Sequence, residues 1–139
     1  MDNGEKKSHN YTILDYKTGK KIVDNMEYAK VVSEDLVFDG KKCYDTSGII
    51  HFSLDSFATC SDAGYNDGFM LVKSNNIYRY IDKSGNTLVN SEFTVPERIG
   101  DHLMNWSVRP FNDGFGLIMR DGKWGLIDRF GTTTFDYQQ

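Results

Sequence analysis

One pattern of residues occurs twice in this chain at a fixed spacing. Residues 64–85 read GYNDGFMLVKSNNIYRYIDKSG, and residues 110–131 read PFNDGFGLIMRDGKWGLIDRFG. Four pairs of matching residues are each 46 positions apart: Gly68 and Gly114, Tyr78 and Trp124, Asp82 and Asp128, Gly85 and Gly131. A constant offset without a gap indicates a repeat architecture, and this constrains the fold more than any other feature of the sequence.

Each copy predicts a β-hairpin. In the second copy the strand-like segment 115–120 (FGLIMR) is followed by Asp121-Gly122 and then by 123–128 (KWGLID). Asp-Gly between two strand-like segments favours a type I′ turn, because both turn positions need positive φ. In the first copy the segments 69–73 and 77–82 flank asparagines, which tolerate the same backbone region.

A second turn follows each hairpin. Asp128 and Gly131 occupy the first and fourth positions of D-R-F-G, which is typical of a type I turn followed by a left-handed residue. A third strand, 132–135 or 86–89, completes a three-stranded antiparallel meander. The recurrence of Asp82 and Asp128 before each turn favours carboxylates that accept backbone N–H bonds over a pair of catalytic acids.

A shorter unit precedes these two. Segments 36–38, 41–45 and 49–52 are strand-like, with Gly48 closing the second turn, and 13–23 resembles the last hairpin of a further unit. We therefore predict a polar tether at 1–10 and a single domain at 11–137. The domain divides into a half-unit (11–25) and three units (26–52, 57–90 and 100–136).

The segments between the units differ from one another. The sequence predicts a turn-rich loop at 53–63, with room for one helical turn. Thr94 and Glu97 fit a capping box, and Ile99, Leu103 and Trp106 follow at helical spacing. This predicts a short helix near 96–105. The predicted fold class is all-β, made of tandem hairpins whose apolar faces are buried only when neighbouring units stack. Whether the array closes is left open.

Composition excludes several classes of partner. The chain has 139 residues and a formal net charge of −4, without the basic stripe that nucleic-acid binding requires. No apolar run approaches the length of a membrane span, and the first ten residues lack the apolar region of a signal peptide. This start fits a natural N-terminus, or one that follows a removed leader.

The last unit resembles the bacterial WG repeat. Asp121-Gly122-Lys123-Trp124-Gly125-Leu126-Ile127-Asp128, the later Gly131 and the opening 111–115 (FNDGF) carry the resemblance. The middle unit departs from it with Arg79 in place of the glycine after the aromatic residue. The resemblance implies an all-β repeat protein, often exported or envelope-associated in bacteria, with no activity common to the family.

No residue pattern predicts a catalytic or metal site. The Asn-Asp-Gly triplets at 66–68 and 112–114 lack the further carboxylates of a calcium loop, and a turn is favoured. Cys43 and Cys60 have no CxxC spacing, so two thiols are favoured over a disulfide. His9, His51 and His102 share no ligand spacing. We predict no enzymatic activity, no cofactor and no metal.

The remaining function is binding. We predict a non-catalytic binding or scaffold module that presents a sheet surface or edge to a partner protein or peptide. The candidate contact residues are Arg79, Tyr80, Trp106, Arg120 and Lys123. The alternative is carbohydrate or cell-wall binding through exposed aromatic residues. Trp124 and Tyr78 are predicted to lie in the core, and the oligomeric state and the compartment are left open.

Overall fold

The fold was analysed in a computed structural model, which describes residues 11–14, 18–95 and 111–135. Within these ranges the chain is all-β, without a helix, and forms four antiparallel sheets. The predicted tether at 1–10, the predicted helix near 96–105, Trp106, His9 and His102 lie outside the described residues.

The sheets follow one another along the chain. The first pairs β1 (Tyr11–Leu14) with β2 (Lys21–Met26). The second has the order β3 (Lys30–Ser33), β4 (Leu36–Phe38), β5 (Lys42–Asp45), β6 (Ile50–Ser53). The third has the order β7 (Thr59–Asn66), β8 (Phe69–Ser74), β9 (Ile77–Ile81). The fourth has the order β10 (Phe115–Arg120), β11 (Lys123–Asp128), β12 (Thr133–Thr134).

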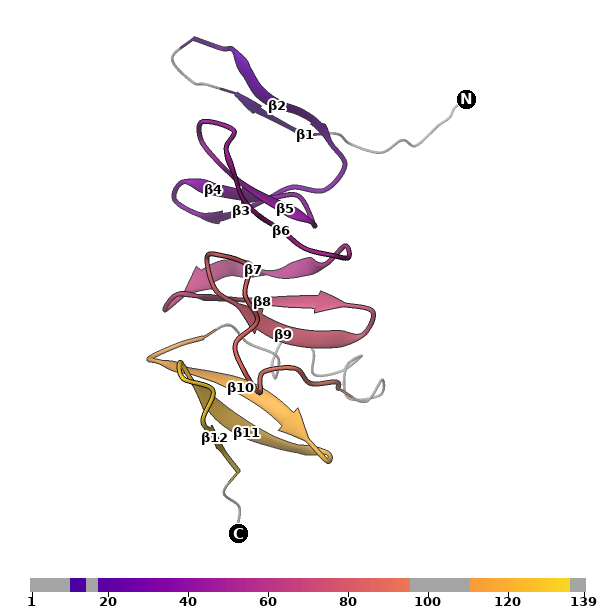
Figure 1. The fold of residues 1–139 in the computed structure, drawn as a ribbon, viewed down its shortest axis with the longest axis vertical. Helices are drawn as coiled ribbons and strands as arrows, with labels where there is room; N and C mark the ends of the chain where they lie inside the picture. The colour runs from indigo at the N-terminus through magenta and orange to yellow at the C-terminus, as the bar shows by residue number, and fades with distance from the viewer. Residues whose placement is uncertain (1–10, 15–17, 96–110, 136–139) are drawn as a thin grey trace.

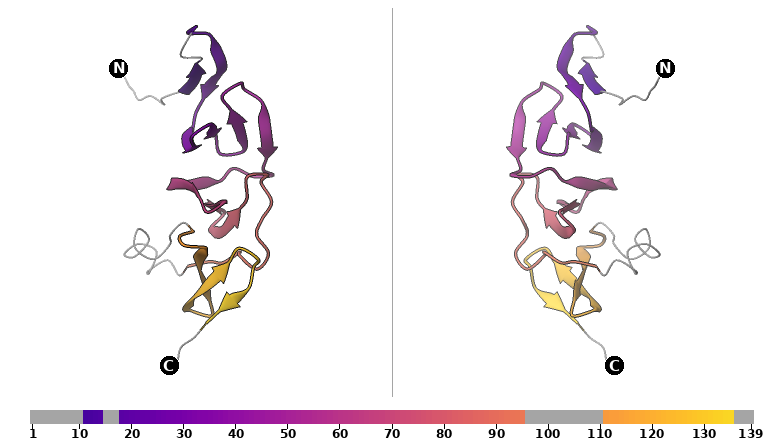
Figure 2. Two further views of the ribbon diagram at one scale, coloured as in Figure 1. Left: turned by 90° about the vertical axis from the view of Figure 1, so that its left-hand side faces the viewer. Right: turned by 90° about the vertical axis from the view of Figure 1, so that its right-hand side faces the viewer.

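The sheets are stacked in chain order along the long axis of the molecule (Figure 1). The β1–β2 hairpin lies at one end and the β10–β12 sheet at the other, and the side views show the same order (Figure 2). The described sheets therefore form an open stack, and the array does not close on itself.

The 46-residue repeat is a repeat of backbone geometry. Five pairs of residues with positive φ are separated by this offset: Asp67 and Asp113, Gly68 and Gly114, Asn75 and Asp121, Asn76 and Gly122, Gly85 and Gly131. β10 begins and ends 46 positions after β8, and both hairpins have two positive-φ residues at the tip, as a type I′ turn requires. The predicted tandem-hairpin fold is confirmed.

Two details of the predicted strands were wrong. The segment 86–89 is reduced to an isolated bridge between Ile81 and Thr87. The third strand of the middle sheet is instead β7, which begins at Thr59 inside the segment predicted as a loop. β7 was missed because its sequence, TCSDAGYN, has little apolar alternation, and only Gly64 within it is buried.

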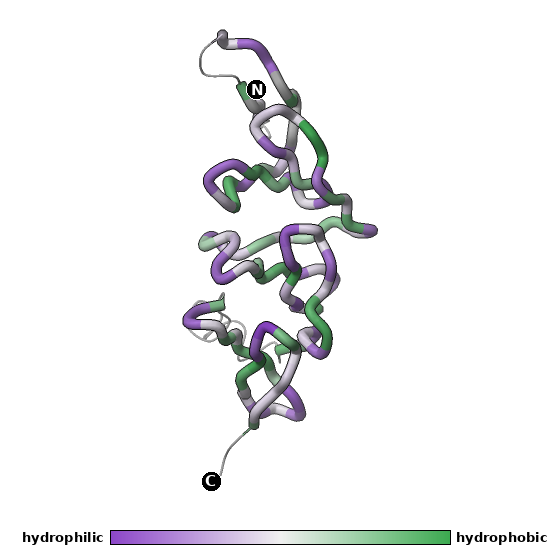
Figure 3. Tube along the Cα trace, turned by 60° about the vertical axis from the view of Figure 1, so that its left-hand side comes forward, coloured by the Kyte–Doolittle hydropathy of each residue, from purple (hydrophilic) through white to green (hydrophobic). Residues whose placement is uncertain are grey.

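The core consists of two apolar clusters on opposite faces of the middle sheet. Met70, Val72 and Ile81 face the second sheet and join the cluster that contains Phe38, Cys43 and Phe52. Leu71, Tyr78 and Tyr80 face the fourth sheet and join the cluster that contains Phe111, Ile118 and Ile127. Because successive side chains of a strand point to opposite faces of the sheet, neighbouring residues lie in different cores. The hydropathy-coloured trace shows apolar segments recurring in successive layers (Figure 3).

Tyr80 connects the middle and fourth sheets directly. Its hydroxyl donates to the Leu117 carbonyl oxygen at 2.9 Å and accepts from the Leu117 N–H at 3.0 Å. Gly116 leaves the space for the ring, because a Cβ at this position would lie 2.8 Å from Tyr80 Cζ. Nearby, the Asp67 carboxylate accepts the Gly114 N–H at 2.9 Å, which joins the Asn-Asp-Gly turns of the two units.

In the middle and last units, the second turn packs against the unit before it. A Cβ on Gly85 would lie 2.6 Å from Phe52 Cγ, and a Cβ on Gly131 would lie 2.6 Å from the Val89 carbonyl oxygen. Phe52 and Val89 each come four residues after the corresponding glycine of the preceding unit, Gly48 and Gly85. The same close approach therefore sets both successive steps of the stack.

Candidate functional site

Two adjoining hollows form a groove on the side of the stack. One, of about 350 Å³, is lined by Ser53–Ser56, Arg79 and part of the middle hairpin tip. The other, of about 550 Å³, is lined by Phe93–Val95 and Met119–Gly122. Both include Ile77 and Glu92. We name this continuous surface the side groove; it borders the second, third and fourth sheets.

Arg79 lies on β9 and lines the side groove. Its side chain is half-buried, and Nη1 donates to Thr87 Oγ1 at 3.0 Å. A guanidinium has five N–H donors in a fixed fork, so this single bond leaves most of its donor capacity for a ligand. The remaining N–H donors have the geometry to bond an acceptor such as a carboxylate or a carbonyl oxygen.

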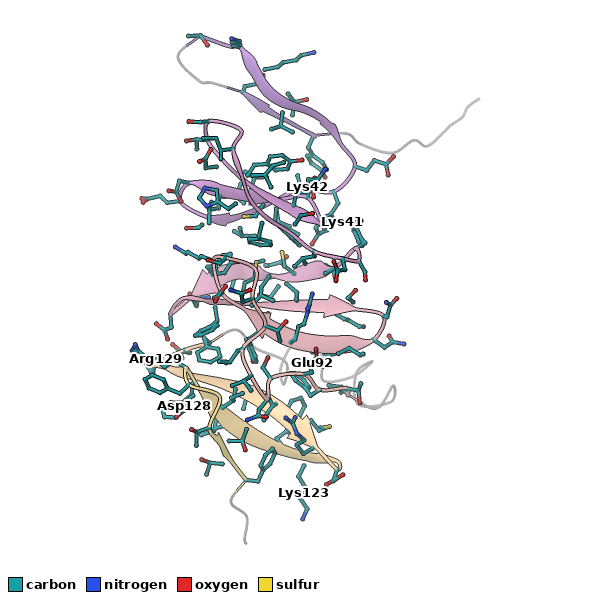
Figure 4. All side chains as sticks on the ribbon, viewed as in Figure 1. Lys41, Lys42, Glu92, Lys123, Asp128 and Arg129 are labelled. Carbon is teal, nitrogen blue, oxygen red and sulfur yellow. The ribbon has the colours of Figure 1, made fainter. Side chains whose placement is uncertain are left out.

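Glu92 supplies the opposite charge in the same groove. It is exposed, and Figure 4 places it between the middle and fourth sheets. Ile77, which is also exposed, lines both hollows and offers an apolar contact surface. The sequence analysis did not identify either residue as part of a site. Glu92 follows the second turn in a segment without repeat or periodicity, so no local signal could have indicated its position.

Arg120 has a structural role. Its guanidinium donates from Nη2 to the Asn90 carbonyl oxygen and from Nη1 to those of Glu92 and Met119. The bonds to Asn90 and Glu92 hold the segment that follows β9 against β10. Arg120 borders the side groove, but its donors are largely directed at the backbone of its own chain.

Tyr80 does not lie on the surface. Its side chain is 0% exposed, and an edge-to-face contact at 4.9 Å joins its ring to Phe111. Burial excludes Tyr80 from direct contact with a partner, which corrects its assignment as a binding residue. Lys123 is exposed beside the tip of the β10–β11 hairpin, away from Glu92 (Figure 4).

The predicted core aromatics differ in exposure. Tyr78 is buried and stacks on Phe93 at 5.2 Å. Trp124, its equivalent in the last unit, is half-buried and packs against the same cluster, with its ring 6.2 Å from that of Phe93.

The three D-x-x-G turns share one set of hydrogen bonds. Asp82 Oδ1 accepts the N–H groups of Ser84 and Asn86, and Asp128 Oδ1 accepts those of Phe130 and Thr132. Asp45 does the same for Ser47 and Ile49. Gly48, Gly85 and Gly131 close the turns with positive φ. One oxygen of each carboxylate is thus occupied by the backbone, an arrangement that stabilises turns.

Asp45 also contacts a histidine. Its Oδ2 lies 3.1 Å from His51 Nε2, and this bond, with the backbone N–H bonds, holds the pKa of Asp45 below its usual value. Burial raises the pKa of the Cys43 thiol to about 12, so the thiolate is scarce at neutral pH. Both cysteines are free thiols.

Over the described ranges, no group of three or more His, Cys, Asp or Glu side chains is placed to bind a metal ion. The same part of the chain contains no helix of sufficient length and hydropathy to cross a membrane. Comparisons with protein families, with curated proteins and with solved structures found no match to this chain.

Proposed function

We propose that the chain is a non-catalytic binding or scaffold module of the WG-repeat type, and that it binds an extended segment of a partner protein in the side groove. The observation that carries the proposal is a groove bordered by three sheets, with Arg79, Ile77 and Glu92 in it. A long groove that crosses several units suits an extended peptide, because each unit contacts a different part of the ligand.

The side chains in the groove define the chemistry of the peptide. Arg79 is matched by an acidic residue, Ile77 by an apolar one, and Glu92 by a lysine or arginine. A peptide with separated acidic and basic residues around an apolar side chain therefore fits the groove best. A carbohydrate-binding surface finds less support, because Tyr80, one of its candidate aromatic residues, is buried.

The test is selection of binders from a displayed library of random extended peptides, followed by titration calorimetry with the full chain. Arg79→Ala should weaken the selected peptides by about tenfold or more, because a hydrogen bond to a charged group contributes about 1.5–3 kcal/mol. Lys42→Ala is the matched control. Lys42 occupies the equivalent position on β5, is exposed, and lies outside the groove.

Equal affinity of the parent and Arg79→Ala for the selected peptides would contradict the proposal. Equal losses of affinity in Arg79→Ala and Lys42→Ala would also contradict it. Selection of no peptide, combined with binding on a glycan array, would favour the carbohydrate alternative. The melting temperature of each variant must match the parent, which excludes unfolding as the cause of lost binding.

A further inference from the structure

The two hollows of the side groove are the same site in successive units. One side of each is a hairpin tip: Ser74 and Asn75 line the smaller hollow, and Arg120 and Asp121, 46 positions later, line the larger one. The other side of each is the segment that follows the second turn of the preceding unit. We name the larger hollow, of about 550 Å³, the tip pocket.

Backbone hydrogen bonds align the two segments that follow the second turns. The Leu54 N–H donates to the Lys41 carbonyl oxygen at 2.6 Å, and the Phe93 N–H donates to that of Tyr78 at 2.8 Å. Lys41 and Tyr78 each come four residues before the aspartate of a D-x-x-G turn. Leu54 and Phe93 are therefore equivalent positions, and both side chains are buried.

The alignment shows how the chemistry of the site changes between units. Two neutral positions of the smaller hollow, Ser53 and Asn75, are occupied in the tip pocket by the carboxylates Glu92 and Asp121. The acidic position of the smaller hollow, Asp55, is occupied by a threonine. The tip pocket therefore has one carboxylate on the hairpin tip and one on the facing segment, where Glu92 lies between the middle and fourth sheets (Figure 4).

The tip pocket has a net negative charge that is available to a ligand. Both carboxylates are exposed, and within the described residues neither has a hydrogen-bond or ion-pair partner. Among the described residues that line the pocket, only Arg120 is basic, and its guanidinium donates to three backbone carbonyl oxygens. Two carboxylates and one guanidinium leave a charge of −1, so the pocket is suited to a cationic group with N–H donors.

The remaining walls of the tip pocket are largely apolar. Phe93 and Met119 are buried, Val95 is half-buried and Ile77 is 41% exposed, and all four line the pocket. Arginine and lysine combine a long aliphatic stem, which packs on apolar surface, with a charged head that bonds to oxygen. A small inorganic cation would leave these apolar walls in contact with water, so the walls favour a long basic side chain.

We propose, on the basis of the function proposed above, that the tip pocket binds an arginine or lysine side chain of the partner segment, with Glu92 and Asp121 accepting its N–H groups. Arg79 lies one step earlier in the stack and binds the acidic residue of the same segment. Packed sheets lie about 10 Å apart, and an extended chain rises about 3.3 Å per residue. The basic and acidic residues of the segment should therefore be about two to four positions apart.

The test is a double-mutant cycle between the full chain and the peptides selected as described above. In the peptide, the basic residue is replaced by methionine, which keeps an unbranched apolar stem and removes the charge. In the full chain, Glu92→Gln and Asp121→Asn are combined. Both substitutions keep the shape of the side chain, and asparagine is the residue that the middle unit has at the second position, Asn75.

With the parent chain, replacing the basic residue of the peptide should raise the dissociation constant about tenfold at low salt, since two exposed charge pairs are lost. With the double variant the same replacement should raise it less than about twofold. Peptides with arginine and with lysine at this position are both measured. Asp113→Asn is the matched control, because Asp113 is exposed and has positive φ like Asp121 but lines neither hollow, so the tenfold effect should persist.

Two results would overturn the assignment of the tip pocket alone. One is an equal effect of the peptide substitution on the parent and on the double variant, for both arginine and lysine peptides, while Arg79→Ala still weakens binding. The other is a set of selected peptides without a basic residue two to four positions from the acidic one. Failure to select any peptide would overturn this proposal together with the proposed function. Equal melting temperatures of the parent and the variants exclude unfolding as the cause of a change in affinity.

Discussion

Tyr80 shows how strongly one side chain can depend on its neighbours in this fold. We predict that Tyr80→Phe lowers the free energy of unfolding by about 1–3 kcal/mol, because it leaves the partly buried N–H of Leu117 without its acceptor. Urea denaturation measures this loss. Tyr44→Phe is the control, since its hydroxyl donates to Asp39 near solvent and its removal should cost less. Equal losses in the two variants would contradict the role given to Tyr80.

Asp45 gives the protein a predictable response to acid. Because the folded-state pKa of Asp45 is lowered, its contribution to stability is complete above the unfolded-state pKa and is lost as the pH falls through the folded-state value. The melting temperature of the parent should therefore fall more steeply below about pH 5 than that of Asp45→Asn. Parallel curves for the two proteins would show that ionisation of Asp45 does not contribute to folding stability.

The misassignment of Tyr80 has a physical cause. Alternation along a strand separates a buried face from an exposed one only when one face of the sheet is in water. The middle sheet is covered on both faces, so both Tyr80 and Ile81 are buried. Single-residue exposure could not be predicted there without knowing the number and order of the layers.

At the scale of elements, the D-x-x-G turn both reverses the chain and fixes the distance to the preceding unit. Gly131→Ala should cost about 1 kcal/mol for its positive φ and roughly 1–3 kcal/mol more for overlap with Val89. Gly122→Ala isolates the first contribution. Gly122 also has positive φ, but its Cβ would meet nothing within 4 Å. The free energy of unfolding, measured by chemical denaturation, should therefore be lower for Gly131→Ala than for Gly122→Ala. The reverse order would contradict the packing described.

Elements defined by local chemistry were predictable from the sequence. The hairpin tips and the D-x-x-G turns require particular residues, such as Asp121-Gly122, so the strands next to them could be located. β7 pairs with β8 and lies close to β3, where Gly64 approaches the backbone of Val32. Its position depends on these tertiary contacts, and its sequence carries no signal of its own. The side groove likewise depends on how three sheets stack, and of its residues only Arg79 and Arg120 were predicted to contact a partner.

For the whole molecule, the middle sheet makes the two cores interdependent. Leu36→Ala, in the core shared with the second sheet, should destabilise the protein by about 2–5 kcal/mol. The unfolding midpoint reported by Trp124 fluorescence, in a Trp106→Phe background, should shift as far as the midpoint from far-UV circular dichroism. A fluorescence midpoint that stays in place would show that the last two units unfold independently of the second sheet.

The two ends of the last hairpin differ in how much new sequence they can accept. The D-x-x-G ends are locked to the preceding layer through Gly85 and Gly131, whereas a Cβ on Gly122 at the β10–β11 tip would project into open space. Foreign loops inserted between Asp121 and Gly122 would extend outwards without altering the spacing of the sheets. The tip of the last hairpin is therefore suited to the display of grafted peptide segments.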